Sequence, residues 1–585
     1  MALSFKFAFE KALANQPAPA FAAEPVSQPL VASKPEDLPV AQVDERIDAK
    51  PIKNKSKESR YLADKIDLKK YSNRPKPKPA PKRTQPRYRH LPDNPRDTVK
   101  VKKLLPETRV TCLADAEVKW HPSSQGADKL LTVDLQYRSQ TGVATTERRI
   151  DRELVIGVDL GTSSTKVVIA DRTLKQAYAI PFTDGAGVMS YLLPTLLVES
   201  DGAYSLSGQG VHLNDLKLAM MAKPDNPVCC ARVAAFLALV IQHARAWLFQ
   251  NHRDQYTSSE ILWSLALGQP ADQLTSATSK SLFRQIGQIA WSLANTSGPL
   301  SVKKVLDVWS AGKTNQADTD EFQCLVMPEL AAQIHGYVSS SLFDPRRPNI
   351  FLMVDVGAGT VDASIFRVYK DETGTTSFNL FTNSVEAYGV ANLHRHRVNW
   401  WQNNLADLPN GSQCVQELQQ IKLPTEYRGF FPASFKDYVQ GVDVQFLNGA
   451  KNPDESFFDR INQQLVGEIF GRAKEKRLLG PNDIDGMPYF LCGGGARHSF
   501  YEQIKPALQR PRGATWLNLV PKPLSLPANL RAEGVSRADY DRLSVAYGLS
   551  QLNLGTVNRI APMKPLATVD HYSKWGDNYA DKDFC

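Results

Sequence analysis

The chain has 585 residues, of which 42% are hydrophobic and 22% are charged. This composition is typical of globular proteins and excludes a collagen, a membrane channel and a wholly disordered chain. At about 150 residues a domain, the length predicts about four domains. The net charge of +9 is unevenly distributed, because residues 51–110 hold 19 Lys and Arg against 6 Asp and Glu.

The N-terminal part, residues 1–104, is rich in proline and lysine and includes the run Arg-Pro-Lys-Pro-Lys-Pro at residues 74–79. Proline removes backbone donors and like charges repel, so this part is predicted to be extended and disordered. A basic arm of this kind suits an acidic surface, and we expect a protein partner for it. Nucleic acid or a lipid surface is an alternative, and so is a solvated tether without a partner.

The longest apolar run, residues 233–241, is shorter than the roughly 20 residues that span a bilayer, and it predicts a buried helix. Lys6, Glu10 and Lys11 interrupt the apolar residues at the N-terminus, unlike the continuous apolar core of a secretory signal. The 7 cysteines are odd in number and form no C-x-x-C pair, which argues against a disulfide framework or a zinc ribbon. We therefore expect a cytoplasmic protein without a membrane span.

The pattern of predicted secondary structure changes at Leu154. Alternating apolar and polar residues at 117–120 and 130–137 predict a small β-rich accessory segment over residues 105–153. After Leu154, short apolar strands that end in glycine turns alternate with long amphipathic helices, which indicates an α/β architecture.

Two segments of this α/β region repeat one another without a gap. Residues 158–169 read Val-Asp-Leu-Gly-Thr-Ser-Ser-Thr-Lys-Val-Val-Ile, and residues 354–365 read Val-Asp-Val-Gly-Ala-Gly-Thr-Val-Asp-Ala-Ser-Ile. Each predicts a strand, an Asp, a glycine turn and a second strand. One such turn is usually a plain hairpin. Two copies in register indicate a duplicated domain whose hairpins face each other across a cleft.

The residues of these hairpins suit phosphate binding. Glycines allow backbone N–H groups to approach anionic oxygens, hydroxyl groups of Thr162, Ser163, Ser164 and Thr360 add donors, and aspartates can hold magnesium through water. A third glycine cluster at residues 489–498, Tyr-Phe-Leu-Cys-Gly-Gly-Gly-Ala-Arg-His, predicts either a tight strand-to-helix turn or a close approach of the backbone to a flat ligand such as adenine.

These three segments resemble the phosphate-1, phosphate-2 and adenosine motifs of the actin, sugar kinase and heat-shock chaperone superfamily. Their order and spacing are closest to the nucleotide-binding domain of DnaK-type chaperones, over residues 154–552. Residues 327–332, 388–395 and 544–548 resemble further segments of that domain.

The resemblance implies an actin-like ATPase fold with two duplicated, ribonuclease-H-like lobes around a nucleotide cleft. Lobe I would span residues 154–345 and lobe II residues 346–552, with an inserted subdomain at 390–480. Residues 553–585 would be a tail, too short for the peptide-binding β-sandwich of about 100 residues that follows in these chaperones.

The resemblance also implies roles for individual residues, with ATP and magnesium as cofactors. The catalytic group would be Asp159, Asp355, Lys217 and Glu329, and the two aspartates would hold the metal. Nucleotide-binding positions would be Gly161, Thr162, Ser163, Ser164, Gly357, Ala358, Gly359, Thr360, Asp362, Gly389, Gly493, Gly494, Gly495 and Arg497, the last by stacking on adenine.

The sequence departs from the family at two places. Ala358 replaces a glycine of the second hairpin, and alignment on Pro328 puts Met327 where the family keeps its catalytic glutamate. Either Glu329 substitutes for that glutamate or water activation is weakened. We expect a slow magnesium-dependent ATPase that acts as a conformational switch on a protein partner. The alternatives are an actin-like filament-forming ATPase and a kinase of a small metabolite.

Overall fold

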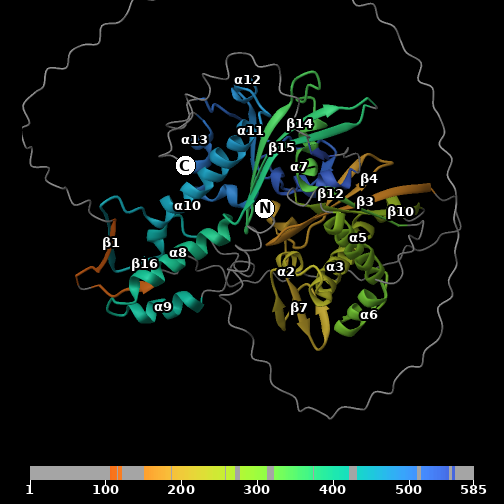
Figure 1. The fold of residues 1–585 in the computed structure, drawn as a ribbon. Helices are drawn as coiled ribbons and strands as arrows, with labels where there is room; N and C mark the ends of the chain where they lie inside the picture. Colours follow the sequence, from red (N-terminus) through yellow and green to blue (C-terminus); the bar gives the residue numbers. More distant parts are fainter. Residues whose placement is uncertain are drawn as a thin grey trace, which may run out of the picture. The chain divides into compact units, whose positions relative to one another are not determined.

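The structure is a computed structural model of mixed α/β type, built around two β-sheets (Figure 1). It describes residues 106–114, 116–120, 150–185, 187–256, 259–270, 277–312, 322–372, 374–420, 431–509, 516–551 and 557–559. The extension expected at 1–104, the strand expected at 130–137 and most of the expected tail lie outside these residues.

The first sheet begins with an antiparallel meander, in which β3 pairs with β4 and β4 with β5. Two further strands, β10 and β12, continue the sheet parallel to β3 on its other side. Its strands in the described residues are β3 (Ile150–Leu160), β4 (Ser164–Asp171), β5 (Gln176–Ala179), β6 (Leu193–Pro194), β10 (Ser259–Gln269), β12 (Gln323–Pro328) and β20 (Leu530–Arg531).

The second sheet repeats this topology. Strands β13, β14 and β15 form the antiparallel meander, and β18 and β19 extend it parallel to β13. Its strands in the described residues are β13 (Ile350–Val356), β14 (Val361–Lys370), β15 (Thr376–Glu386), β18 (Pro488–Cys492), β19 (Val520–Pro521) and β21 (Val557–Arg559). The same strand order and directions in both sheets agree with a duplicated domain.

The run at residues 233–241 lies in a buried helix, as predicted. Helix α3 (Pro227–Asn251) begins where the side chain of Asn226 accepts hydrogen bonds from the N–H groups of Val228 and Cys229. It packs with α5 (Ala277–Ala294) and α6 (Val302–Gly312) on the first sheet. By length and composition α3 is apolar enough to cross a membrane, which is weak evidence because most of its apolar stretch is buried in this core.

Smaller elements complete the half of the structure that contains the first sheet. They are helices α2 (Leu216–Ala222) and α4 (Arg253–Tyr256), the turn η2 (Val188–Tyr191), and a separate sheet of β7 (Leu197–Ser200), β8 (Ala203–Ser205), β9 (Val211–Leu213) and β11 (Leu300–Ser301).

Two helices join the sheets. Helices α7 (Glu329–Val338) and α14 (Ser544–Ser550) share one apolar cluster with strands of both sheets, including β4, β13 and β15. The helices cross at Gly548, where a Cβ atom would lie 2.0 Å from the carbonyl oxygen of Ala332. Because β20 and α14 contact the first sheet, the chain after residue 530 belongs to both halves and not to lobe II alone.

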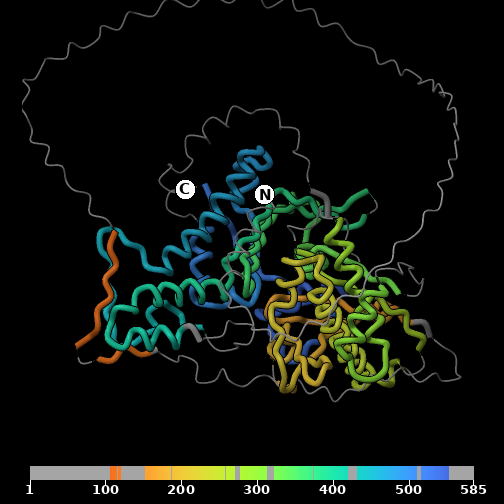
Figure 2. The backbone as a smooth tube through the Cα atoms, turned by 60° about the horizontal axis from the view of Figure 1, so that its bottom comes forward, coloured from red at the N-terminus to blue at the C-terminus, as the bar shows by residue number. Residues whose placement is uncertain are grey.

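A small subdomain has an apolar core of its own, centred on Trp401, Phe435 and Tyr438. It holds α8 (Val390–Leu405), α9 (Gly411–Gln420), η4 (Phe435–Tyr438), β16 (Val439–Gln440) and β17 (Val442–Leu447). Strands β1 (Glu107–Cys112) and β2 (Lys119–Trp120) pair with β17 and β16, and Figure 2 shows β1 in orange beside this part of the chain. Strands β1 and β2 therefore complete the subdomain and do not form an accessory sheet of their own, and residues 150–153 belong to β3 of the first sheet.

The next helices belong to the second sheet. Phe457, Ile461 and Ile469 lie in the same cluster as Val354 and Ile365 of the sheet. The part with its own core thus ends before Pro453, earlier than the insertion expected at 390–480. The remaining elements are α10 (Pro453–Asn462), the π-helix η5 (Gln463–Phe470), α11 (Gly471–Glu475), α12 (Pro481–Ile484), η6 (Gly494–Arg497), η7 (Ser499–Gln503), α13 (Ile504–Leu508) and η8 (Tyr540–Arg542).

The crossing of α7 and α14 gives a stability prediction. Gly548→Ala forces the two helices apart, and we expect it to lower the free energy of unfolding by about 1–3 kcal/mol, the usual cost of overpacking. Gly467→Ala in η5 is the matched control, because the nearest atom to its new methyl group is 3.6 Å away. Urea unfolding followed by circular dichroism measures both. Equal stability of the Gly548→Ala variant and the parent would show that the helices do not depend on this close approach.

Candidate functional site

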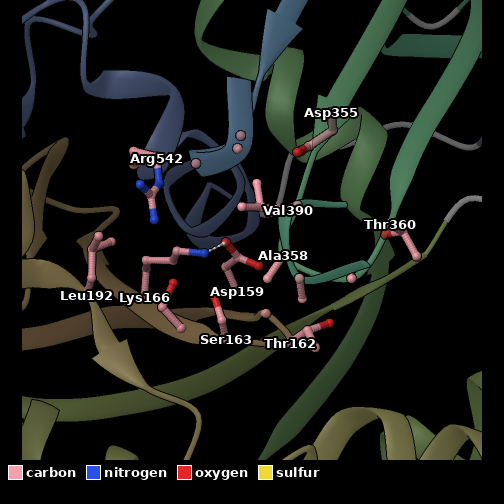
Figure 3. A pocket seen from close by; sticks show the side chains of 18 of the residues that line it. Asp159, Thr162, Ser163, Lys166, Leu192, Asp355, Ala358, Thr360, Val390 and Arg542 are labelled. Carbon is pink, nitrogen blue, oxygen red and sulfur yellow. Dashed lines mark hydrogen bonds and ion pairs between the residues drawn. The ribbon is translucent and has the colours of Figure 1, made fainter. Parts of the chain in front are cut away.

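A pocket of about 650 Å³ is lined by both hairpins and by the third glycine cluster (Figure 3). Every site residue expected from the sequence lines it except Gly389. Gly389 precedes α8, where a Cβ atom would lie 2.5 Å from the carbonyl oxygen of Ala358, so its place is explained by packing against the second hairpin.

The two hairpins meet across this pocket. Asp159 pairs with Lys166 in the β3–β4 ladder, and Asp355 pairs with Asp362 at the equivalent place of the β13–β14 ladder. The turns that follow the two aspartates lie close together, since a Cβ atom on Gly359 would be 3.8 Å from Cγ2 of Thr162.

In the second hairpin, the start of α8 binds the carbonyl groups of the turn. The N–H groups of Val390, Ala391 and Gly389 donate to the carbonyl oxygens of Gly357, Ala358 and Gly359 at 3.2, 2.8 and 3.2 Å. The side chain of Asn392 adds a bond of 2.7 Å to the carbonyl oxygen of Gly359.

Because these carbonyl groups already accept hydrogen bonds, the N–H groups are the backbone groups of the turn that remain available. The N–H groups of Ala358, Gly359 and Thr360 bond to no acceptor in the described part of the chain. Consecutive N–H groups of this kind form a concave site for an anion.

The first hairpin is held in a similar way by Thr195. Its hydroxyl group donates to the carbonyl oxygen of Gly161 at 2.8 Å, and its N–H group donates to the carbonyl oxygen of Ser163 at 3.1 Å. Among the described residues, the N–H groups of Thr162 and Ser163 bond to no acceptor. Both hairpins therefore bring unused backbone donors to one pocket.

The glycines of the pocket fall into two groups. At Gly161 a Cβ atom would lie 2.4 Å from the carbonyl oxygen of Ser164, and Gly493 has a φ of +89°, so the fold itself requires glycine at both. At Gly357 and Gly359 the nearest atoms are 3.4 and 3.8 Å away, and φ is not in the left-handed region. The fold would accept a methyl group at both positions, so packing does not explain why these two pocket residues are glycines.

The two aspartates have different partners. Oδ2 of Asp159 accepts a hydrogen bond of 3.0 Å from Nζ of Lys166, and Oδ2 of Asp355 accepts one of 2.5 Å from Nε2 of the buried Gln333. Burial raises the pKa of Asp355 to about 6, the bond from Gln333 opposes the rise and the charge of Asp159 adds to it. The charge of Lys166 also opposes the rise, but its Nζ is bonded to Asp159, so the ionised form of Asp355 has no ion pair of its own among the described residues.

Lys217 and Glu329 form an ion pair in the pocket, with Nζ 2.9 Å from Oε1. Glu329 is the first residue of α7, and Gly268 makes room for it, because a Cβ atom there would lie 2.6 Å from its Cγ. Burial raises the pKa of Glu329, and the charge of Lys217 opposes the rise. Met327 is buried in an apolar cluster with Val155 and Leu549. Of the two expected candidates, only Glu329 reaches the pocket.

At the third glycine cluster, acidic side chains hold Arg497 in place. Its guanidinium donates to Asp541 at 2.6 Å and to Asp539 at 3.3 Å, and Asp541 also accepts a bond of 3.1 Å from the N–H group of Gly493. Arg497 lines the pocket at a fixed position, as a group that stacks on a flat ring needs.

Five polar residues of the site were not foreseen: Lys166, Gln333, His498, Asp541 and Arg542. The alternation of β4 places Lys166 on the same face as Ser164, which is a signal that could have identified it. Gln333 belongs to the connecting helix, but no motif marks its side chain. Asp541 and Arg542 lie on the short turn η8, for which the sequence gives no periodic pattern.

Two carboxylates of the pocket could hold magnesium together with oxygens of another ligand. No group of three or more His, Cys, Asp or Glu side chains that could hold a metal occurs in the described residues. Magnesium commonly uses one or two carboxylates, phosphate oxygens and waters, and Asp159 and Asp355 can supply the carboxylates.

Comparison with protein-family models and with curated proteins gave no match for this chain. Its function is therefore inferred from the geometry of the site.

The raised pKa of Asp355 predicts a pH-dependent stability. Because the folded carboxyl holds its proton up to about pH 6, against a usual value of 3.8, the free energy of unfolding falls as the pH rises from about 4 to 6. Asp355→Asn removes this loss, and in the absence of ligand the variant should be more stable than the parent at pH 7.5 by up to about 2 kcal/mol, and equal to it at pH 4.

Urea unfolding at both pH values measures this difference. Asp407→Asn is the control, since Asp407 is exposed and outside the pocket. A parent protein that is more stable than the Asp355→Asn variant at pH 7.5 would show that a cation already compensates the carboxylate.

Proposed function

We propose that the protein is a magnesium-dependent ATPase of the actin-like fold, similar to the nucleotide-binding domain of DnaK-type chaperones. One observation carries the proposal: two equivalent hairpins turn their unused N–H groups into the same pocket, at Thr162 and Ser163 on one side and at Ala358, Gly359 and Thr360 on the other. The repeated strand order of the two sheets supports the two-lobed fold.

Three further features support a nucleotide as the ligand. The two glycines that the fold does not require, Gly357 and Gly359, line the pocket beside the donors of the second hairpin. The cationic side chains of Lys166 and Lys217 lie in the same pocket, where they can contact phosphate oxygens. Arg497 offers a planar face at the third glycine cluster for a base.

The methyl group of Ala358 does not close the pocket, since Ala358 is itself a lining residue and its N–H group is free. In this proposal the N–H groups of both hairpins bind the phosphate chain, which fixes the terminal phosphorus in the pocket. Positioning and charge neutralisation supply most of the catalysis of phosphoryl transfer.

Hydrolysis would use Glu329 and Lys217. The oxygen of a water molecule forms a bond to the γ-phosphorus, the bond from that phosphorus to the β–γ bridging oxygen breaks, and ADP keeps the electron pair. Glu329 accepts the proton of the water, and burial, which raises its pKa, makes its carboxylate a stronger base. Lys217, 2.9 Å from Glu329, orients the carboxylate. Magnesium, when bound through Asp159 and Asp355, supplies positive charge at the phosphate oxygens.

The two halves of the pocket belong to two sheets that share α7 and α14. Hydrolysis removes the γ-phosphate, a ligand group that both hairpins bind. We propose that this loss changes how far the two halves close on the ligand, and that a protein partner binds the two states differently. The proposed contact between the partner and residues 1–104 lies outside the described residues.

The role of Glu329 gives a kinetic prediction. Glu329→Gln keeps an acceptor for Lys217 but removes the base, so phosphate release from ATP should fall about 100-fold, within the usual range for a general base, while the dissociation constant for ATP stays nearly unchanged. Phosphate release is measured with magnesium and without an added acceptor. Glu502→Gln, an exposed change outside the pocket, is the control.

An unchanged rate of phosphate release by the Glu329→Gln variant would show that another residue is the base. Parent protein that releases no phosphate until a small hydroxyl compound is added would favour the metabolite kinase instead. ATP-dependent sedimentation of the parent would favour the filament.

A further inference from the structure

Arg542 is a cationic residue of the pocket that the proposed mechanism has not used. It ends the turn η8, directly before α14, and its guanidinium lies against Gly494, where a Cβ atom would be 2.8 Å from Nη1 of Arg542. Figure 3 shows the guanidinium pointing into the pocket, on the side of Lys166 and Leu192. A residue with a side chain at position 494 would displace it.

The other cationic side chains that line this pocket have acidic partners. Lys166 pairs with Asp159, Lys217 with Glu329 and Arg497 with Asp541. The guanidinium of Arg542 makes no hydrogen bond or ion pair to any of the described residues. The neighbouring carboxylate, Asp541, is already bound by Arg497 and by the N–H group of Gly493.

The position of Arg542 is therefore costly in the absence of a ligand. Burial lowers the pKa of its guanidinium, and the charge of Arg497 lowers it further, although Asp541, Asp355 and Asp159 partly compensate. Arginine cannot lose its proton in a protein, so the group remains charged. A guanidinium that lines a pocket and has no hydrogen-bond partner among the described residues indicates an anionic ligand.

We propose that Arg542 is an internal arginine that binds the terminal phosphate of the nucleotide and stabilises the negative charge that this phosphate carries during hydrolysis. This inference rests on the proposed function.

The phosphate end is favoured over the base by the neighbours of Arg542. Although its guanidinium lies against Gly494 of the third glycine cluster, Arg542 interacts electrostatically with Asp159 and Asp355, the carboxylates at the ends of β3 and β13, and its side chain points toward Lys166. The base would lie at Arg497, whose guanidinium is fixed by Asp539 and Asp541. An arginine at the transferred phosphate adds the positive charge that phosphoryl transfer needs as the bond to the leaving oxygen breaks.

The test compares Arg542→Gln and Arg542→Lys with Arg537→Gln. Arg537 is exposed, outside the pocket and close in sequence, so its change removes the same charge without touching the site. Calorimetry gives the dissociation constants of ATP, adenosine and inorganic tripolyphosphate with magnesium, and single-turnover experiments give the rate of phosphate release.

We expect Arg542→Gln to weaken ATP and tripolyphosphate at least 10-fold, to leave adenosine within 2-fold and to slow phosphate release roughly 1000-fold, the lower range for an arginine that acts on phosphoryl transfer. Arg542→Lys should recover part of the affinity but little of the rate, because an ammonium group lacks the two-pronged geometry. Arg537→Gln should behave as the parent.

The outcomes separate this inference from the proposed function. Parent protein that binds neither ATP nor tripolyphosphate would overturn both. Parent protein that binds and hydrolyses ATP while Arg542→Gln does so equally well would overturn the role of Arg542 alone. If thermal unfolding shows that Arg542→Gln does not fold, the Arg542→Lys variant decides, since unchanged affinity and unchanged rate in that variant contradict the proposal.

Discussion

The hydrogen bonds from the start of α8 to the second hairpin are the constraint on which the rest of the site depends. Because Val390, Ala391 and Gly389 bind three successive carbonyl groups, the peptide units of this turn have one orientation, with their N–H groups unbound. The same bonds explain why Gly389 is a glycine although it does not line the pocket. Thr195 has the equivalent effect on the first hairpin. The donors are thus set before a ligand arrives, which is the preorganisation that anion binding and phosphoryl transfer require.

The charges of the pocket are arranged around this framework. Lys166, Lys217 and Arg497 each have an acidic partner. Asp355, whose pKa is raised, and Arg542, whose guanidinium makes no ion pair with a described residue, carry charges that their surroundings compensate only in part. The charges of Asp355 and Arg542 have opposite signs. A polyphosphate that carries a divalent cation would supply the missing partner at both, since the cation would compensate Asp355 and a phosphate oxygen would compensate Arg542. A simple anion would compensate only the charge of Arg542.

The sequence predicted the parts of the site that local patterns determine. The hairpins were recognisable because each has a short apolar strand, an aspartate, a glycine turn and a second strand, and because this pattern occurs twice in register. Helix α3 was recognisable from its apolar run. The pairing of β1 with β17 was not, because an alternating strand shows which face is buried and not which strand lies beside it. Gln333, Asp541 and Arg542 were missed for a similar reason: they reach the pocket through the tertiary arrangement of α7 and η8, without a periodic pattern or a motif of their own.

The most direct test of the account is a calorimetric titration of Gly359→Val with ATP and magnesium, beside the parent protein. The fold has room for a Cβ atom at Gly359, 3.8 Å from Thr162, and the branched side chain of valine would extend from there into the space between the two hairpins. The account predicts one ATP site per chain in the parent, the loss of that site in Gly359→Val and unchanged binding in the control Gly467→Val. Equal binding of ATP by the parent and by Gly359→Val, or no binding by the parent, would contradict it.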